Sequence, residues 1–183
     1  MKTEHALARE LKKAMSSQPL DSISVSKLSE KCGVSRKTFY YHYHDIYDLL
    51  TQVFLDERIS SVASANNYRD LITIVWKYYK SNEGFVNATL QSAGKDLFLE
   101  FIYNIFYTST MRFINLTEES KKLHLNEKKS IARFYASGYS SSIIYYLTNY
   151  KNKTLDGLLK CFEFIGPINL ENSVKKAAKM GEK

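Results

Sequence analysis

The stretch from Ser24 to Leu50, SVSKLSEKCGVSRKTFYYHYHDIYDLL, constrains the fold more than any other part of the chain. Its first residues place an apolar face at helical spacing: Val25, Leu28 and Cys32. Gly33 ends this first helix, because glycine adopts the left-handed C-cap conformation without strain. Ser35 is then a candidate N-cap, whose hydroxyl can accept from a backbone N–H of a second helix. The stretch therefore predicts two short helices joined by a tight turn.

The second helix, expected over Arg36 to Tyr43, sorts its side chains into two sets. Phe39 and Tyr43 are four residues apart and form an inward stripe with Val34. The outward set consists of cations, hydroxyls and an imidazole: Arg36, Lys37, Thr38, Tyr40, Tyr41 and His42. Such a helix is suited to a polyanion, and a helix-turn-helix places it in the major groove of DNA.

The residues GVSRKTFYYHY, with the flanking SVSKLSEKC and DIYDLL, resemble the DNA-binding signature of the TetR family of bacterial transcription regulators. The resemblance implies an all-α fold of about nine helices, in which an N-terminal three-helix domain binds DNA. It also implies a C-terminal helical domain that forms a homodimer and holds a small-molecule pocket. We accordingly expect a DNA-binding domain over 1–47 and a regulatory and dimerisation domain over 48–183.

One position departs from the family pattern. The family commonly has a lysine at the start of the fourth helix, near a DNA phosphate, and Ile46 stands there in this chain. His44 or Lys37 can substitute for that phosphate contact.

The DNA contacts are expected on two helices. Arg36, Lys37 and Thr38 come first on the recognition helix, where side chains reach base edges, and an arginine there can bond a guanine bidentately. The resemblance favours Tyr40 and His42 as phosphate donors. The N-terminal amides of the preceding helix can also hold a phosphate, although for its first serine an N-cap role competes. The whole predicted DNA-binding set is Ser24, Ser26, Lys27, Ser35, Arg36, Lys37, Thr38, Tyr40, Tyr41, His42 and His44.

Net charge supports an anionic partner only mildly. The 183 residues carry a formal charge of +7, with a pI of about 9.2. Residues 1–48, however, hold eight Lys/Arg and six Asp/Glu, a net of only +2. The motif, and not the charge, is what predicts DNA binding.

Several other classes of protein are disfavoured. The charged N-terminus has no signal-peptide core, and no uncharged run is long enough to span a bilayer, so we expect a cytoplasmic protein without a membrane partner. No Cys/His cluster has metal-ligand spacing, and no glycine-rich phosphate loop or nucleophile elbow occurs. We therefore expect no metal, no cofactor and no catalytic residue.

With only two prolines and seven glycines, the rest of the chain favours long helices. They are expected over 3–15, from about 45 onward, and over 68–81, 85–92, 95–114, 126–149 and 154–165. Residues 60–67 and 117–125 are expected as loops, 82–84 as a turn, and the tail from Glu171 as loose or frayed.

Two further sites are predicted in the C-terminal domain. Aromatic residues can line an apolar ligand pocket, although filling the core explains each of them as well: Trp76, Tyr79, Phe98, Phe101 and Phe106. The helices over 126–149 and 154–165 are apolar on two sides, which predicts a two-fold four-helix interface. Its expected residues are Gly138, Tyr139, Ser142, Ile143, Tyr146, Leu158 and Phe162. Phe164 lies off the stripe of its own helix that contains Leu158 and Phe162, and it is expected on the outer side.

The function expected is that of a homodimeric transcription regulator, most simply a repressor that a small-molecule inducer releases from double-stranded operator DNA. A regulator of the same fold controlled by a protein partner, acting as an activator, is the alternative. The segment RFYASG resembles a branch of the family that includes an activator of dihydroxyacetone metabolism. An enzyme is the remote alternative, because no convergent titratable groups are evident.

Overall fold

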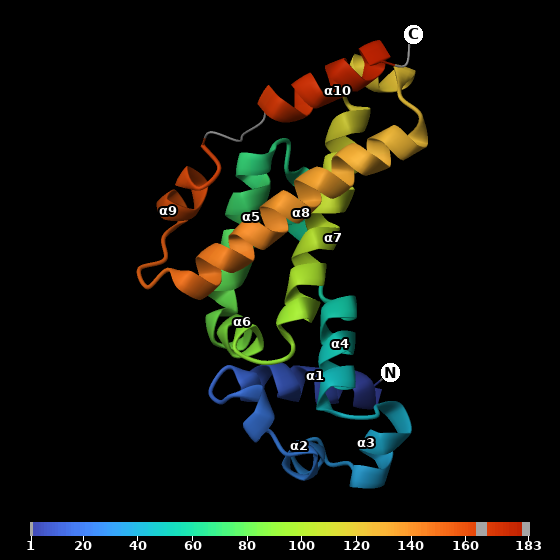
Figure 1. Cartoon of the computed structure of the whole chain (residues 1–183). Coiled ribbons are helices and arrows are strands. Elements are labelled where there is room, and N and C mark those ends of the chain that lie inside the picture. The colour runs from blue at the N-terminus through green and yellow to red at the C-terminus, as the bar shows by residue number, and fades with distance from the viewer. Residues whose placement is uncertain (1, 164–167, 181–183) are drawn as a thin grey trace. The chain divides into compact units, whose positions relative to one another are not determined.

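The computed structural model describes residues 2–163 and 168–180 of the chain, and within them it is all-α (Figure 1). This confirms the expected fold class. The α-helices are α1 (Lys2–Met15), α2 (Val25–Lys31), α3 (Arg36–His42), α4 (Ile46–Asp56), α5 (Tyr68–Ser81), α6 (Glu83–Leu90), α7 (Lys95–Asn115), α8 (Leu125–Asn149), α9 (Leu155–Lys160) and α10 (Ile168–Met180). Three short 3-10 helices join them: η1 (Leu20–Ser22), η2 (Ser60–Ser64) and η3 (Glu118–Lys122).

Most helix ends fall at the expected capping residues, and the exceptions have local causes. Asp45 caps α4, because its Oδ1 accepts from the backbone N–H groups of Tyr47 and Asp48 at 2.8 and 2.9 Å. The expected N-cap of α8, Asn126, is wrong by two residues. His124 takes that place, and its backbone N–H donates to the Glu127 carboxylate at 2.7 Å in a capping box.

Packing divides the chain into two compact units. Unit 1 comprises Met1–Arg58 and Tyr79–Phe101, and unit 2 comprises Ile59–Tyr78 and Ile102–Lys183. Unit 1 therefore contains α6 as well as the first four helices. The functional division at residues 47 and 48 is a separate prediction, which this packing does not test.

In unit 1, α1 packs on α2, α4 and α6. Leu7 and Leu11 of α1 are fully buried, as their helical spacing predicts. Gly84 allows the close approach of α6, because a Cβ at this position would lie 2.5 Å from the carbonyl oxygen of Ser16. Lys12 reaches from α1 to the end of α4, where its Nζ lies 2.8 Å from the Glu57 Oε2. The first helix thus links the helix-turn-helix to α4 and α6.

Unit 2 has a core of stacked aromatic rings. The ring of Tyr139 lies 4.3 Å from that of Tyr68 and 5.1 Å from that of Phe106, measured between centroids, with interplanar angles of 24° and 11°. The Tyr68 hydroxyl is 2.8 Å from the Thr110 Oγ1. Burial raises the pKa of both Tyr68 and Tyr139 above that of an exposed tyrosine.

The tail that was expected to be loose or frayed is a packed helix, α10. Leu170, Val174 and Ala178 recur every four residues, and their exposed fractions are 7%, 0% and 5%. This stripe covers η3 and part of α8. The Tyr135 hydroxyl and the Ser173 Oγ lie 3.0 Å apart and add a polar contact to the same packing.

The sequence predicted that the face of α8 with Tyr139 and Ile143 lies outward, and this prediction is wrong. Five residues assigned to the dimer interface are buried within unit 2: Tyr139, Ile143, Tyr146, Leu158 and Phe162. The cause is that the segments after α8 fold back onto it. Phe162 packs on the Tyr139 ring at 4.8 Å, and the Tyr146 hydroxyl donates to the Thr154 carbonyl oxygen at 3.1 Å. Gly138 is exposed and Ser142 half-buried, whereas Phe164 lies outside the described residues.

The described part of the chain contains neither a membrane-spanning helix nor a group of metal-binding side chains. None of its helices combines the length and the apolar character that crossing a membrane requires. Nor does it contain a group of three or more His, Cys, Asp or Glu side chains arranged to hold a metal ion.

Candidate nucleic-acid interface

The turn between α2 and α3 is fixed by two residues of the predicted types. Gly33 has φ +66°, the one positive φ among the described residues, and it ends α2 as expected. Ser35 caps α3, because its Oγ accepts from the backbone N–H of Thr38 at 3.0 Å. The Oγ1 of Thr38 lies 2.9 Å from the same Oγ. Both hydroxyls therefore help to define the start of the helix.

The seven residues of α3 separate into a buried anchor and an exposed face. Phe39 is fully buried and Tyr43, its C-cap, is 6% exposed. The opposite face presents Arg36 and Lys37, both exposed, together with Tyr40 and Tyr41. The helix is therefore held from one side by aromatic packing, while two cations and two phenols face outward.

Two of these exposed side chains are held near each other. The Arg36 guanidinium carbon lies 5.9 Å from the centroid of the Tyr40 ring. Tyr41, at 85% exposed, is the most exposed of the large apolar side chains in the described residues. The exposed face of α3 thus combines a cation with aromatic rings that carry hydroxyl groups.

His42 is less available than its place on α3 predicted. It is half-buried, and its Nδ1 lies 3.4 Å from the Oε1 of Glu4 in α1. Sequence reasoning missed Glu4, because the two residues are 38 positions apart and no local pattern links them. This contact connects α1 to the recognition helix.

The start of α2 offers a smaller polar surface. Ser24 stands at the N-cap position, but its side chain makes no capping hydrogen bond. The predicted capping role is thus unfilled, and the exposed Ser24 hydroxyl can donate to a phosphate. Lys27 is exposed one helical turn further on, whereas Ser26 is half-buried.

The start of α4 contains one contact that the sequence did not predict. The Tyr47 hydroxyl donates to the Asp21 Oδ1 at 2.6 Å and so joins α4 to η1. This hydrogen bond raises the pKa of Tyr47, because the neutral phenol is the donor. His44 is exposed and Ile46 half-buried, so the imidazole is the more accessible of the two side chains at this end.

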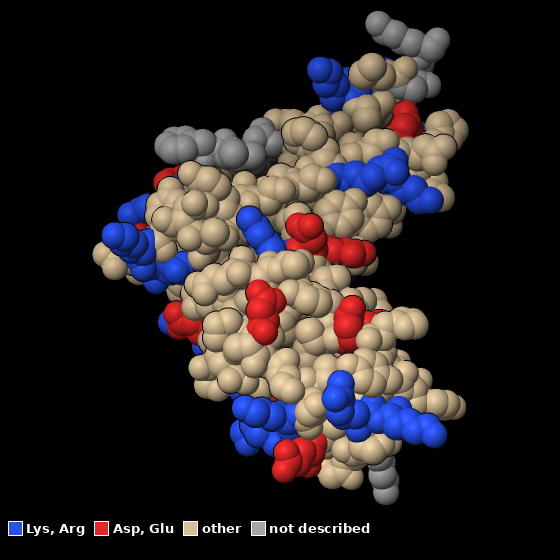
Figure 2. Space-filling model, turned by 60° about the horizontal axis from the view of Figure 1, so that its bottom comes forward, with Lys and Arg blue, Asp and Glu red and all other residues tan. Residues whose placement is uncertain are grey.

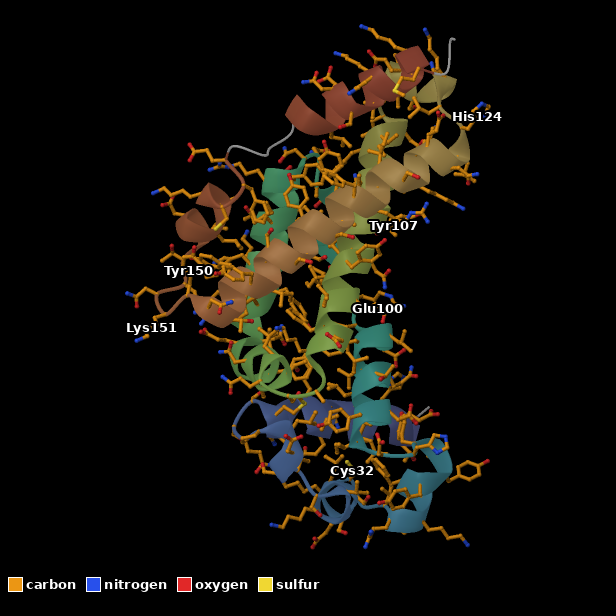
Figure 3. The ribbon with its side chains drawn as sticks, in the orientation of Figure 1. Cys32, Glu100, Tyr107, His124, Tyr150 and Lys151 are labelled. Carbon is orange, nitrogen blue, oxygen red and sulfur yellow. The ribbon has the colours of Figure 1, made fainter. Side chains whose placement is uncertain are left out.

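Charge alone does not mark a binding face. Figure 2 shows Lys and Arg in separate groups with Asp and Glu between them, and no continuous basic band on the face it displays. The recognition helix is therefore identified by its pattern of buried and exposed residues. Cys32, the C-cap of α2, marks in Figure 3 the place where the chain leaves α2 and turns toward the recognition helix α3.

The aromatic residues predicted for a pocket are divided between the two units. Tyr79, Phe98 and Phe101 belong to unit 1, whereas Trp76 and Phe106 belong to unit 2. Phe98 is fully buried and packs on Phe54 of α4 at 5.8 Å. Burial and the nearby Glu83 carboxylate raise the pKa of Tyr79 to about 12.

The hydroxyl of Tyr139 is a buried polar group in the core of unit 2. Tyr139 is 3% exposed, and among the described residues its hydroxyl has no hydrogen-bond partner. It lies within the aromatic stack of Tyr68 and Phe106.

Most of the C-terminal region of the chain matches a known protein family. Residues 66–165, more than half of the 183-residue chain, match the profile of a TetR-type transcriptional regulator C-terminal region. The chain belongs to the TetR family of transcriptional regulators. This confirms the resemblance that the N-terminal motif carries, from a part of the chain outside that motif.

Among solved structures, this TetR-family chain is similar to the dihydroxyacetone kinase operon activator DhaS. The TM-score is 0.58 at 18% sequence identity, and 97% of each chain is covered. At that identity the similarity shows the fold alone. A comparison with curated proteins finds no match.

Proposed function

We propose that this TetR-family regulator binds operator DNA as a homodimer and that α3 is the helix that enters the major groove. The observation that carries the proposal is the arrangement of α3. It is capped by Ser35 and anchored by Phe39, and it presents Arg36 and Lys37 outward. In this arrangement Arg36 reads a base edge, and Lys37 neutralises a phosphate.

Other predicted contacts position the helix on the DNA backbone. Tyr40 and Tyr41 donate to phosphates, as does the unengaged hydroxyl of Ser24 at the start of α2. Lys27 and His44 add charge at the edges of the interface. Ser35 and Thr38 act mainly by shaping the helix start, because their hydroxyls already contact each other.

The homodimer is proposed to form through the exposed face of α8. Phe134 and Tyr145 are 76% and 63% exposed, and the small residues Gly138 and Ser141 lie between them on the same face. A Cβ added to Gly138 would meet nothing within 4 Å, so packing within the chain does not explain this glycine. A glycine in mid-helix costs about 1 kcal/mol relative to alanine, and a second copy approaching closely gives it a purpose.

We propose that the regulator is a repressor that a small-molecule inducer releases from its operator. The inducer site is assigned to the aromatic core of unit 2, where the buried Tyr139 hydroxyl can donate to a ligand. Half-sites one helical turn apart require recognition helices roughly 34–36 Å apart, so a small change in their spacing weakens binding.

The second candidate is an activator of the same fold that a protein partner controls. It is favoured by the name of the structurally similar protein, which is an operon activator. The two candidates share the DNA-binding mode and differ in the signal.

Selection from random duplexes followed by gel shift tests the proposal. The wild-type chain is expected to enrich a near-palindromic site, whereas Arg36→Ala with Lys37→Ala is expected to enrich none. Lys151→Ala with Lys153→Ala also removes two cations, but from the loop after α8, and serves as the control. If the wild-type protein enriched no sequence, operator binding through α3 would be rejected.

A further inference from the structure

Arg36 is the cation that the proposed function assigns to a base edge, and its long side chain is exposed at the start of α3. None of the ion pairs among the described residues includes it. A long side chain that moves freely loses conformational entropy when a base fixes it, and this loss weakens binding. A contact that holds the guanidinium before DNA arrives therefore strengthens the reading of a base.

The ring of Tyr40 makes such a contact. The Arg36 guanidinium carbon lies over this ring, 5.9 Å from its centroid. The two residues are four apart in a helix, so their side chains share one face. Side chains in a helix also lean toward its N-terminus, which directs the Tyr40 ring toward the turn that contains Arg36. The contact therefore forms together with α3.

The Tyr40 ring is in turn held by the core of unit 1. It meets the ring of Phe39 edge to face, with centroids 5.4 Å apart and an interplanar angle of 85°. Phe39 is fully buried, and its ring also packs on that of Tyr43 at 5.7 Å. Tyr40 is 50% exposed, so part of its side chain is packed and part is left for the guanidinium. Packing thus runs from the buried Phe39 through Tyr40 to the exposed Arg36.

We propose that Tyr40 is a specificity-determining residue, because its ring positions Arg36 for a guanine. The inference rests on the proposed function, in which α3 enters the major groove. A cation held over a ring face forms no hydrogen bond with that ring, so the N–H donors of the guanidinium stay available. Arginine donates two hydrogen bonds to the O6 and N7 of guanine, the commonest specific contact with a base. The ring of Tyr40 acts through Arg36, whereas its hydroxyl is a separate group that donates to a phosphate.

Tyr41 provides an internal comparison, because it is the same type of residue on the same helix. Its side chain is 85% exposed, and its ring lies 5.1 Å from that of His42 at an interplanar angle of 87°. Tyr41 is five residues from Arg36, so it does not share the face on which Arg36 and Tyr40 meet. Removing the Tyr41 ring therefore controls for effects of losing a phenol that do not pass through the guanidinium.

The contact is tested first in the free full-length protein, without DNA. The ring current of Tyr40 shifts the NMR signals of the Arg36 side chain, and Tyr40→Phe is expected to retain this shift because it keeps the ring. Tyr40→Leu is expected to abolish the shift, whereas Tyr41→Leu is expected to leave it unchanged. Arg36 signals that Tyr40→Leu does not move overturn the inference, whatever DNA the protein binds.

The second test measures base preference. Fluorescence anisotropy gives the Kd of the selected operator and of duplexes with each other base at the position where Arg36→Ala relaxes the preference. Tyr40→Leu is expected to reduce the preference for guanine there about two- to fivefold, the size of an exposed cation–π contact. Tyr40→Phe is expected to keep the preference, although it lowers the affinity for all duplexes alike by losing the hydroxyl. Tyr41→Leu, the matched control, is expected to keep the preference as well.

The ratio of Kd values separates positioning from a merely structural role, because a distorted helix lowers the affinity for every duplex and leaves the ratio unchanged. An unchanged ratio for Tyr40→Leu overturns the inference, as does a ratio that Tyr40→Phe reduces equally, which would assign the effect to the hydroxyl. A further loss of preference on adding Tyr40→Leu to Arg36→Ala also overturns it, because Tyr40 would then act without Arg36. Preference for a base other than guanine rejects the assigned base.

Failure of the proposed function gives a different result. If the wild type selects no operator, or if Arg36→Ala relaxes no position, base reading by α3 is rejected, and the role of Tyr40 in specificity is rejected with it. If Arg36→Ala relaxes a position and Tyr40→Leu does not, the proposed function stands and only the inference about Tyr40 fails.

Discussion

The hydroxyl of Tyr47 donates a 2.6 Å hydrogen bond to the Oδ1 of Asp21 and so joins the first turn of α4 to the 3-10 turn before α2. The bond requires a neutral phenol and raises the pKa of Tyr47. Its stabilising contribution is therefore fully present below the ordinary tyrosine pKa of about 10 and is lost as the pH rises through the raised value.

Tyr47→Phe is expected to lower the free energy of unfolding at pH 7 by about 1 kcal/mol or less, because the pair is exposed and water competes for it. Asp21→Asn retains an acceptor and is expected to cost less. Urea denaturation measures both, and the Tyr47→Phe difference should shrink at strongly alkaline pH. Equal stability of the wild type and Tyr47→Phe at pH 7 would mean that the bond contributes nothing.

The local elements of the DNA-binding region could be predicted because their signals are contiguous in the chain. Gly33, Ser35 and Asp45 each fix a helix end through groups within a few residues. The pairs of Tyr47 with Asp21 and of His42 with Glu4 could not be predicted, because they are 26 and 38 residues apart. Such contacts arise only when the helices pack.

The face of α8 was mispredicted for a related reason. Both sides of this helix are apolar enough to be buried, so periodicity alone cannot decide between them. Tyr139 and Ile143 are buried, and the Tyr139 ring stacks on Tyr68 of α5 and Phe106 of α7 and is covered by Phe162. These partners are distant in the sequence, so the register of α8 is decided only when the helices pack.

Arg36 and Lys37 are expected to differ in what they contribute to DNA binding. Arg36→Ala should relax the base preference at one position by about 1–3 kcal/mol. Lys37→Ala should weaken binding to all sequences and reduce the slope of log K against log salt by about 0.9. Gel shifts on operator variants at several salt concentrations measure both effects. A salt slope that Lys37→Ala leaves unchanged would place this lysine away from any phosphate.

Ile46→Lys is expected to strengthen DNA binding. The side chain is half-buried at the first position of α4, where the family commonly has lysine. The gain should appear as one additional phosphate contact, a steeper salt slope by about 0.9. Ile46→Met, which is similar in size and uncharged, is the control. Equal slopes for the two variants would show that this position does not face the DNA backbone.

The raised pKa of Tyr79 predicts how the stability of the folded protein changes at alkaline pH. Burial and Glu83 raise its pKa to about 12, above the unfolded value of about 10. The unfolded chain therefore loses this proton first, so the folded protein loses stability between about pH 10 and pH 12. Tyr79→Phe should make that loss shallower, as measured by urea midpoints at each pH. Parallel curves for the wild type and Tyr79→Phe would show that this phenol does not contribute to alkaline destabilisation.

The last prediction separates the exposed face of α8 from its buried face. Phe134→Glu with Tyr145→Glu places charges on the exposed side and should yield a folded monomer, because a two-fold contact repeats each charge in both copies. Gly138→Arg should act in the same way, since nothing in its own chain lies within 4 Å of the new Cβ. Operator affinity should then fall sharply, because each monomer presents only one recognition helix.

Ile143→Glu is the comparison variant, because it places a glutamate on the same helix at a fully buried position. An unpaired carboxylate in the core is expected to destabilise unit 2 by several kcal/mol, so this variant should lose helical signal or melt at a much lower temperature. Sedimentation measures the mass and circular dichroism the folding of each variant. If Phe134→Glu with Tyr145→Glu stayed folded and dimeric, the exposed face of α8 would not be the interface. If that variant unfolded as Ile143→Glu does, the exposed face of α8 would be needed for the folding of the chain, and the expectation of a folded monomer would be wrong.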